Sequence, residues 1–134
     1  MSDAAMDELI AAARAVRHHA YAPYSKFLVG AAVRAGSGKV YAGANVENAS
    51  YGLALCAERS AVAAAIAAGE TRVDGVAVVT SSSPPAGPCG MCRQVLAEFA
   101  DDALPLALVN EAGEREDTTL GALLPRAFRR PDLG

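Results

Sequence analysis

Three cysteines and one glutamate are the residues through which this sequence could do chemistry. Cys56 opens the triplet Cys-Ala-Glu that ends at Glu58, and Cys89 and Cys92 lie in the run Pro-Cys-Gly-Met-Cys. These are all the cysteines of the chain. A structural zinc site usually has four protein ligands, whereas a catalytic zinc site has three and leaves its fourth position to water. Three thiolates therefore predict an open, catalytic zinc site.

Both groups of cysteines are expected at the start of a helix. Cys56 precedes an alanine-rich run that ends before Gly69, and Cys89 follows Pro88 and precedes a second run up to Ala100. Proline suits a helix N-terminus because its missing N–H would have been unpaired there. Thiolates are stabilised by the free N–H groups and the positive dipole end of a helix start. We therefore expect two helix N-termini to converge on one zinc ion per chain.

This ligand set carries an excess negative charge that a neighbouring cation should offset. Three thiolates and Zn²⁺ together leave a net negative charge, which would weaken the metal as a Lewis acid. Arg59 lies three residues after Cys56, so its guanidinium can lie on the same helical face and donate to the sulfur. Arg93 and Gln94 are further candidates for such a contact behind the ligands.

Glu58 is expected to carry protons rather than to bind the metal. It lies two residues after Cys56 and therefore projects from a different side of the first helical turn. In zinc nucleobase deaminases, a glutamate that is not a ligand acts as general acid and base, with an H-x-E…P-C-x-x-C signature. Here Cys56 occupies the place of the histidine.

The three cysteines also permit interpretations other than a catalytic zinc site. Isolated cysteines are often small buried hydrophobic residues, and Pro-Cys-x-x-Cys alone also fits a redox dithiol or half of a zinc ribbon. A redox site needs neither a third cysteine nor Cys-Ala-Glu. A ribbon needs a fourth ligand, for which only His18 and His19 are available. Both are expected near the end of a helix, where histidine meets the negative end of the dipole.

Longer stretches around these motifs resemble the family of small, homotetrameric, zinc-dependent cytidine deaminases. Residues 21–32 resemble the family's first strand, residues 43–52 resemble its ribose-binding segment, and residues 123–128 also match. The resemblance extends from about Tyr21 to Leu133. The sequence departs from the family's pattern at Leu28, Ala44 and Gly87. None of these positions is a zinc ligand, so the departures bear mainly on local packing.

The resemblance implies a role for each residue of the site. It makes the three cysteines the zinc ligands and Glu58 the proton carrier. For the substrate it implies six contacts, through Phe27, Asn45, Glu47, Tyr51, Ala57 and Phe128. Phe27 would stack on the base, Asn45 and Glu47 would bind the sugar, and the backbone N–H of Ala57 would bind the pyrimidine. In a tetramer, Tyr51 and Phe128 would line a neighbour's pocket.

Some of these substrate residues have ordinary structural interpretations as well. From the sequence alone Phe27 is equally a core phenylalanine, and Tyr51 and Phe128 could simply pack. An asparagine near Gly43 is more often a turn former. Asn45 and Glu47 alternate on an extended segment and should therefore point the same way. A carboxylate in the sugar pocket is a poor neighbour for a phosphate, so free nucleosides are favoured over nucleotides.

Hydrophobic periodicity predicts an α/β chain. A helix capped by Ser2 or Asp3 and running to Ala20 has an apolar stripe that should cover one face of a sheet. The expected elements after it are strands 28–35 and 39–43, helix 56–68, strand 73–80, helix 89–100, strand 105–109, edge strand 114–118 and a helical turn from Thr119. The apolar run 76–79 indicates a buried parallel pair with a right-handed crossover. With the resemblance, this implies a three-layer α/β/α fold with a mixed five-stranded sheet, in one domain over 1–134.

Charge and composition narrow the class of partner. The chain has 134 residues, a net charge of −3 and only two lysines, which argues against a nucleic-acid-binding surface. Arg126, Arg129 and Arg130 cluster beside Asp132 and indicate a solvated or intersubunit patch. The N-terminus is acidic, unlike a signal peptide, and no apolar run approaches the ~20 residues that span a bilayer. Reduced, metal-binding thiols fit the cytoplasm, so we expect a cytoplasmic enzyme with no membrane partner.

The expected reaction is hydrolytic deamination of cytidine and 2′-deoxycytidine to uridine and 2′-deoxyuridine with release of ammonia, as in pyrimidine salvage. Three alternatives remain. The chain could act on another aminopyrimidine, such as the antibiotic blasticidin S, although Asn45 and Glu47 weigh against this. A polynucleotide-editing deaminase would require a more basic surface. A zinc-stabilised binding module without catalysis would have no use for Glu58.

Overall fold

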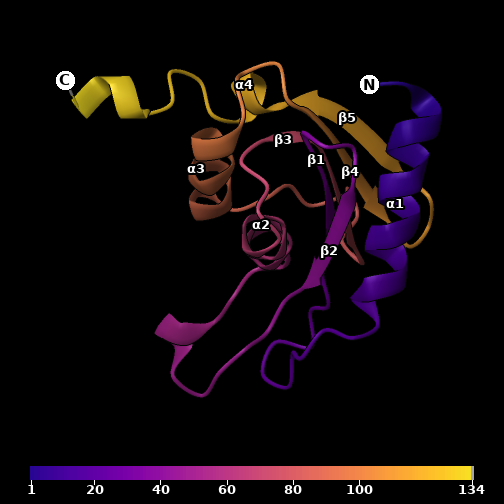
Figure 1. Ribbon diagram of the computed structural model, residues 1–134. Helices are drawn as coiled ribbons and strands as arrows, with labels where there is room; N and C mark the ends of the chain where they lie inside the picture. Colours follow the sequence, from indigo (N-terminus) through magenta and orange to yellow (C-terminus); the bar gives the residue numbers. More distant parts are fainter. Residues whose placement is uncertain (134) are drawn as a thin grey trace.

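The computed structural model describes residues 1–133 and shows a five-stranded sheet with helices on both faces (Figure 1). In chain order the elements are α1 (Asp3–Arg17), β1 (Gly30–Ala35), β2 (Val40–Ala44), a 3₁₀ turn (Tyr51–Leu53), α2 (Ala57–Ala67), β3 (Val73–Thr80), α3 (Gly90–Phe99), β4 (Pro105–Asn110), β5 (Arg115–Thr119), α4 (Leu120–Leu123) and a second 3₁₀ turn (Arg130–Leu133). No helix within the described chain is long and apolar enough to cross a membrane.

The sheet has the strand order β2-β1-β3-β4-β5. β3 and β4 are parallel, and every other neighbouring pair is antiparallel. α3 forms the crossover between the two parallel strands. Residues 76–79 of β3 are fully buried, as expected for a strand covered on both faces. The predicted mixed five-stranded sheet is thus confirmed.

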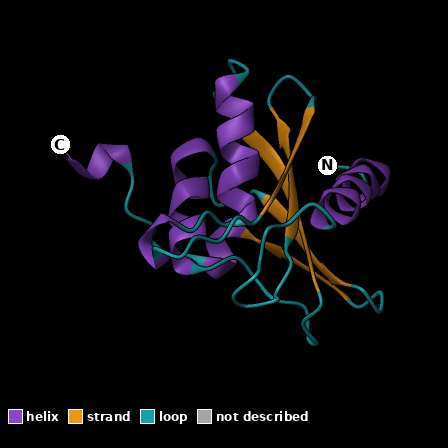
Figure 2. Cartoon of the chain, turned by 90° about the horizontal axis from the view of Figure 1, so that it is seen from below, coloured by secondary structure: helices purple, strands orange, loops and turns teal. Residues whose placement is uncertain are grey.

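Helix α1 covers one face of the sheet, and α2 and α3 cover the other (Figure 2). The buried stripe of α1 contains Met6, Leu9 and Ala13, and it packs on small side chains of β1, β3 and β4. The approach is close at one point. A Cβ at Gly30 would lie 2.0 Å from the carbonyl oxygen of Ala13. Glycine is therefore required where α1 crosses β1.

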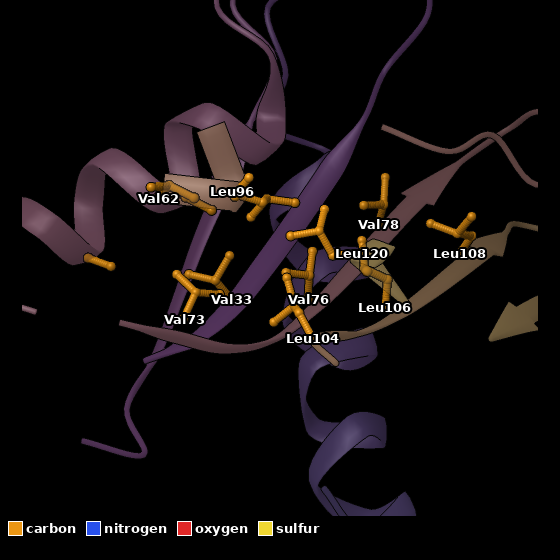
Figure 3. Packing of buried hydrophobic residues seen from close by; sticks show 13 residues of the cluster. Val33, Val62, Val73, Val76, Val78, Leu96, Leu104, Leu106, Leu108 and Leu120 are labelled. Atoms are coloured by element: carbon orange, nitrogen blue, oxygen red, sulfur yellow. The ribbon is translucent and has the colours of Figure 1, made fainter. Parts of the chain in front are cut away.

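A second core lies between the sheet and helices α2 and α3 (Figure 3). Val62 of α2 and Leu96 of α3 pack toward the aliphatic side chains of β1, β3 and β4. α2 also approaches the backbone of β2. A Cβ at Gly43 would lie 2.5 Å from the backbone nitrogen of Ala61 and 2.8 Å from the carbonyl oxygen of Ala57. The position of α2 relative to β2 is thus set by a backbone-to-backbone contact.

Two element boundaries differ from the sequence prediction by more than one residue. α1 ends at Arg17 rather than Ala20, because the next N–H groups turn back to carbonyls three residues earlier. β1 begins at Gly30 rather than Leu28. Asn45 holds the segment just before β1 instead: its backbone N–H donates to the carbonyl of Val29 at 3.3 Å, its Nδ2 donates to the carbonyl of Phe27 at 2.9 Å, and its Oδ1 accepts from the N–H of Val29 at 2.8 Å.

Candidate active site

Two helix starts meet at the three cysteines, as the sequence predicts. Cys56 is the N-cap residue of α2, and Cys89 is the N-cap residue of α3. Cys92 lies in the first turn of α3 and is buried. The Cys56 thiol makes no capping hydrogen bond to its own helix, whereas the Cys89 thiol accepts from the N–H groups of Met91 and Cys92 in the first turn of α3. The helix start thus favours a negative charge on the Cys89 sulfur.

The spacing of the sulfur atoms fits a tetrahedral metal. The Sγ atoms of Cys56 and Cys89 are 3.9 Å apart, and those of Cys89 and Cys92 are 3.6 Å apart. With zinc–sulfur bonds of ~2.3 Å, tetrahedral geometry places sulfurs about 3.8 Å from one another. In the described part of the chain, no histidine or carboxylate joins this group. The site therefore offers three thiolate ligands and leaves a fourth position open.

The thiols differ in their tendency to ionise. Burial raises the pKa of the Cys56 and Cys92 thiols above the ordinary value. Desolvation acts on Cys89 too, but its pKa is lowered because hydrogen bonds from Cys92, Cys56 and the backbone outweigh it. A divalent cation provides the positive charge that turns such buried thiols into thiolates. The donor set therefore suits a metal better than a reactive free cysteine.

Arg59 lies beside the metal ligands. Its Nη2 is 3.9 Å from the Sγ of Cys56 and donates at 3.0 Å to the carbonyl oxygen of Ala54. The hydrogen bond to Cys56 raises the pKa of Arg59. The bond to Ala54 also ties the guanidinium to the segment just before Cys56. The helical spacing of three residues thus brings the positive charge to the sulfur.

The other two candidates for contacts with the sulfurs make different hydrogen bonds. Gln94 donates through Nε2 to the carbonyl oxygen of Phe128 at 2.7 Å, so the structure does not place its amide on a sulfur. Gln94 is exposed and follows Cys92 by two residues, which turns it to another side of α3. Arg93 donates to the carbonyls of Pro88 at 2.7 Å and Leu123 at 2.8 Å. It positions the backbone before Cys89 rather than the sulfur itself.

Glu58 lies in the first turn of α2 and is only 6% exposed. It lines a cavity of about 230 Å³ together with Cys56 and Cys89. Burial raises the pKa of its carboxyl group. A buried carboxyl group with a raised pKa, outside the sulfur cluster, can accept a proton and return it. The geometry thus places a buried carboxyl group next to the three sulfurs but outside their cluster.

Three of the six expected substrate residues line this same cavity: Phe27, Asn45 and Ala57. Phe27 remains 37% exposed, so its ring is not an ordinary core residue. Asn45 lies at the cavity wall while its amide holds the segment around Phe27. Ala57 is fully buried at the start of α2, where backbone N–H groups are free of helical partners.

The remaining three lie elsewhere. Glu47 and Tyr51 line a second hollow of about 350 Å³, together with Tyr24 and Ser25. The rings of Tyr24 and Tyr51 meet edge to face, with centroids 6.1 Å apart. Phe128, in the C-terminal segment, is 58% exposed and lines neither hollow. Within one chain, the structure thus brings only part of the expected substrate site together.

The cavity also has wall residues that the motifs did not indicate. They lie at the end of β3 and in the loop that follows: Val78, Thr80, Ala86 and Gly87. The last residues of the two parallel strands, Thr80 and Asn110, hold this loop through Ser82. Thr80 Oγ1 accepts a hydrogen bond from the N–H of Ser82, and Asn110 Nδ2 donates one to the carbonyl oxygen of Ser82. Sites in open α/β sheets commonly lie at the carboxyl ends of strands, which is the signal that could have identified Thr80.

Comparison with known proteins agrees with this geometry. The sequence model described as the cytidine and deoxycytidylate deaminase zinc-binding region matches residues 4–108. A cytidine deaminase of Sporosarcina psychrophila is 45% identical over 128 residues, which cover 96% of this chain and 94% of that protein. The crystal structure of a Burkholderia pseudomallei cytidine deaminase matches with 48% identity and a TM-score of 0.88, over 96% of this chain and 100% of that one. A Mycobacterium tuberculosis cytidine deaminase matches with 40% identity and a TM-score of 0.81, covering 96% and 98%.

Proposed function

Because the chain belongs to the cytidine and deoxycytidylate deaminase family, we propose that it hydrolyses the C4 amino group of cytidine and 2′-deoxycytidine, giving uridine or 2′-deoxyuridine and ammonia. One observation carries the proposal: three cysteine sulfurs lie together at a spacing that fits a metal, and two of them, Cys56 and Cys89, line a cavity with the buried carboxyl group of Glu58. Thiols bind metal only while reduced, so the proposal places the enzyme in the cytoplasm.

Cys56, Cys89 and Cys92 would hold one zinc ion. When bound, zinc supplies a Lewis acid that lowers the pKa of water to about 7. Glu58 accepts a proton from the attacking water and delivers it to N3 of the base, while the water oxygen bonds to C4. Glu58 then moves the remaining hydroxyl proton to the amino group. The C4–N bond breaks, ammonia leaves, and N3 keeps its proton in the uridine product.

The walls of the cavity, together with Glu47 of the second hollow, would hold the substrate. The ring of Phe27 would stack on the pyrimidine, a contact that contributes roughly 1–3 kcal/mol per base. The N–H of Ala57 would bind the base, and Asn45 and Glu47 would bind the sugar hydroxyls. Glu47 is ionised, because hydrogen bonds from the hydroxyl and backbone of Ser25 lower its pKa. A phosphate on the sugar would be repelled, which favours nucleosides over nucleotides.

A substrate panel tests the proposal directly. Zinc-loaded protein is incubated with cytidine, 2′-deoxycytidine, cytidine monophosphate, free cytosine and blasticidin S, and both ultraviolet absorbance and ammonia release are followed. We expect turnover of the two nucleosides and little of the other compounds. Zinc-loaded protein that releases ammonia from none of them would overturn the proposal, and preference for blasticidin S would assign the chain to another aminopyrimidine.

We also propose that four chains assemble and complete one another's pockets. Large apolar side chains are exposed on the loops before β1 and between β2 and α2, including Tyr51 at 77% and Leu53 at 70%. These loops project from one end of the sheet (Figure 1). Exposed apolar patches of this kind mark surfaces that another chain covers. A covering chain could bring its Phe128, which lines neither hollow of its own subunit, to the hollow at Tyr51.

Light scattering in dilute buffer should therefore report a mass of four chains. Tyr51→Ser should shift the protein to smaller species and raise KM for cytidine, because it removes an apolar contact from the interface. Ile66→Ser, at an exposed apolar position of α2 outside these loops, is the matched control and should stay tetrameric. A fully active monomer would contradict the assembly and the pocket roles of Tyr51 and Phe128.

A further inference from the structure

One hydroxyl group connects two of the proposed substrate contacts. Ser25 lies in the loop before β1, outside the cavity that holds the cysteines. Its Oγ donates a hydrogen bond to Oε2 of Glu47 and accepts one at 3.0 Å from the backbone N–H of Phe27. The same atom thus contacts the proposed sugar-binding carboxylate and the residue whose ring would stack on the base.

The carboxylate of Glu47 is nearly saturated by this loop. Its Oε1 accepts from the backbone N–H groups of Tyr24 at 3.0 Å and Ser25 at 3.1 Å, and its Oε2 accepts from the Ser25 hydroxyl. A carboxylate has about four acceptor positions. Three donors therefore fix its orientation and leave room for a sugar hydroxyl. Without the Ser25 hydroxyl, Oε2 would lose the donor that orients it.

The backbone of Phe27 is held on both sides by the proposed sugar-binding residues. Its N–H binds the Ser25 hydroxyl that in turn binds Glu47, and its carbonyl accepts from Nδ2 of Asn45 at 2.9 Å. This segment precedes β1, and Phe27 lies outside the paired residues of the sheet. The position of the ring therefore depends on the same side chains that would bind the sugar.

We propose that Ser25 is a positioning residue that couples sugar recognition to placement of the base, by holding the carboxylate of Glu47 and the backbone of Phe27 in one hydrogen-bonded unit. The inference rests on the proposed function, because it assigns both contacts to the nucleoside. A sugar bound at Glu47 and Asn45 holds the loop in the conformation that supports the ring. A free base makes no such contact and gains nothing from the unit.

The test compares Ser25→Ala with Ser25→Thr, using zinc-loaded protein and cytidine. Hydrogen bonds to charged groups are among the stronger ones, so we expect KM to rise roughly tenfold in Ser25→Ala while kcat changes much less. Ser25→Thr keeps the hydroxyl and should return KM to within about threefold of the original value. If Ser25→Ala did not fold, Ser25→Cys would carry the same expectation, because a thiol is a weak donor of similar size.

A matched control lies in the hairpin between β1 and β2. The Ser37 hydroxyl also donates to a glutamate, Glu70, and accepts from the N–H two residues on, that of Lys39. Ser37→Ala therefore removes the same kind of hydrogen-bonded unit at a distance from the cavity. It should leave KM for cytidine unchanged. Equal effects of Ser25→Ala and Ser37→Ala on KM would overturn the positioning role.

The pH dependence of KM gives a readout that a merely structural role would not change. The Ser25 hydroxyl is the first cause of the lowered pKa of Glu47, to which the backbone N–H groups and the charge of Lys26 also contribute. Ser25→Ala should raise that pKa, so KM should begin to increase at a higher pH on the acid side. If the original protein deaminates cytidine but Ser25→Ala shows neither change, the inference is wrong. An inactive original protein would instead refute the proposed function.

Discussion

Glu58→Gln is expected to reduce kcat for cytidine by about 10⁴-fold or more while leaving the zinc content unchanged. General acid–base catalysis typically contributes ~10²–10⁴-fold, and here one carboxyl group handles every proton transfer. Glutamine keeps the size and much of the hydrogen bonding of glutamate but cannot carry the proton. The measurements are steady-state kinetics with cytidine and metal analysis of the same preparation.

Binding of cytidine should survive this substitution, because Phe27, Asn45 and Glu47 are untouched. Glu98→Gln changes an exposed glutamate on α3 in the same chemical way and serves as the control, for which we expect normal turnover. Near-normal turnover by Glu58→Gln would contradict the mechanism. Loss of zinc would show instead that Glu58 is a ligand.

Alanine at any one of Cys56, Cys89 and Cys92 is expected to remove most of the zinc and nearly all of the activity. Two remaining thiolates do not complete the three-ligand set of a catalytic site. Stability should fall as well, since metal binding contributes to the free energy of folding and two helix starts meet at this ion. Zinc per chain and the thermal unfolding midpoint are the measurements.

Arg59→Gln separates loss of the metal from loss of the neighbouring positive charge. The guanidinium contacts Cys56 but is not a ligand, so this variant should retain zinc. It should turn over more slowly, because the uncompensated thiolate charge makes water harder to ionise. Stoichiometric zinc in any cysteine variant would refute the ligand set. An unchanged rate and pH profile in Arg59→Gln would show that its charge does not matter.

Much of the fold follows from local patterns in the sequence. The apolar run 76–79 predicted a strand buried on both faces, and strands were predicted over 28–35 and 39–43, where β1 and β2 form an antiparallel pair. The spacing of Cys56, Cys89 and Cys92 predicted two helix starts at one site. These features depend on neighbouring residues or on simple periodicity, which a sequence displays directly.

Features that depend on contacts between distant segments were harder to predict. The side-chain amide of Asn45 holds the segment before β1, and no pattern near Leu28 signals that contact. Asn45 and Glu47 both point toward the loop of residues 24–29, as their alternation indicates, yet they line different hollows. Gln94 donates to a carbonyl of the C-terminal segment, whose position over α3 is a tertiary contact.

The absence of a side chain at Gly43 helps to set the width of the cavity that Glu58 lines, because it decides how closely α2 can approach β2. Gly43 touches the backbone of α2, the helix that begins beside Cys56 and carries Glu58, and it precedes Asn45 by two residues. Any side chain there would push α2 away from β2 and would displace Glu58, which lies in the first turn of that helix. Selection for bulkier nucleoside analogues should therefore leave this glycine unchanged and enlarge the cavity at Thr80 or Val78, which line it from β3 and are not part of the contact between Gly43 and α2.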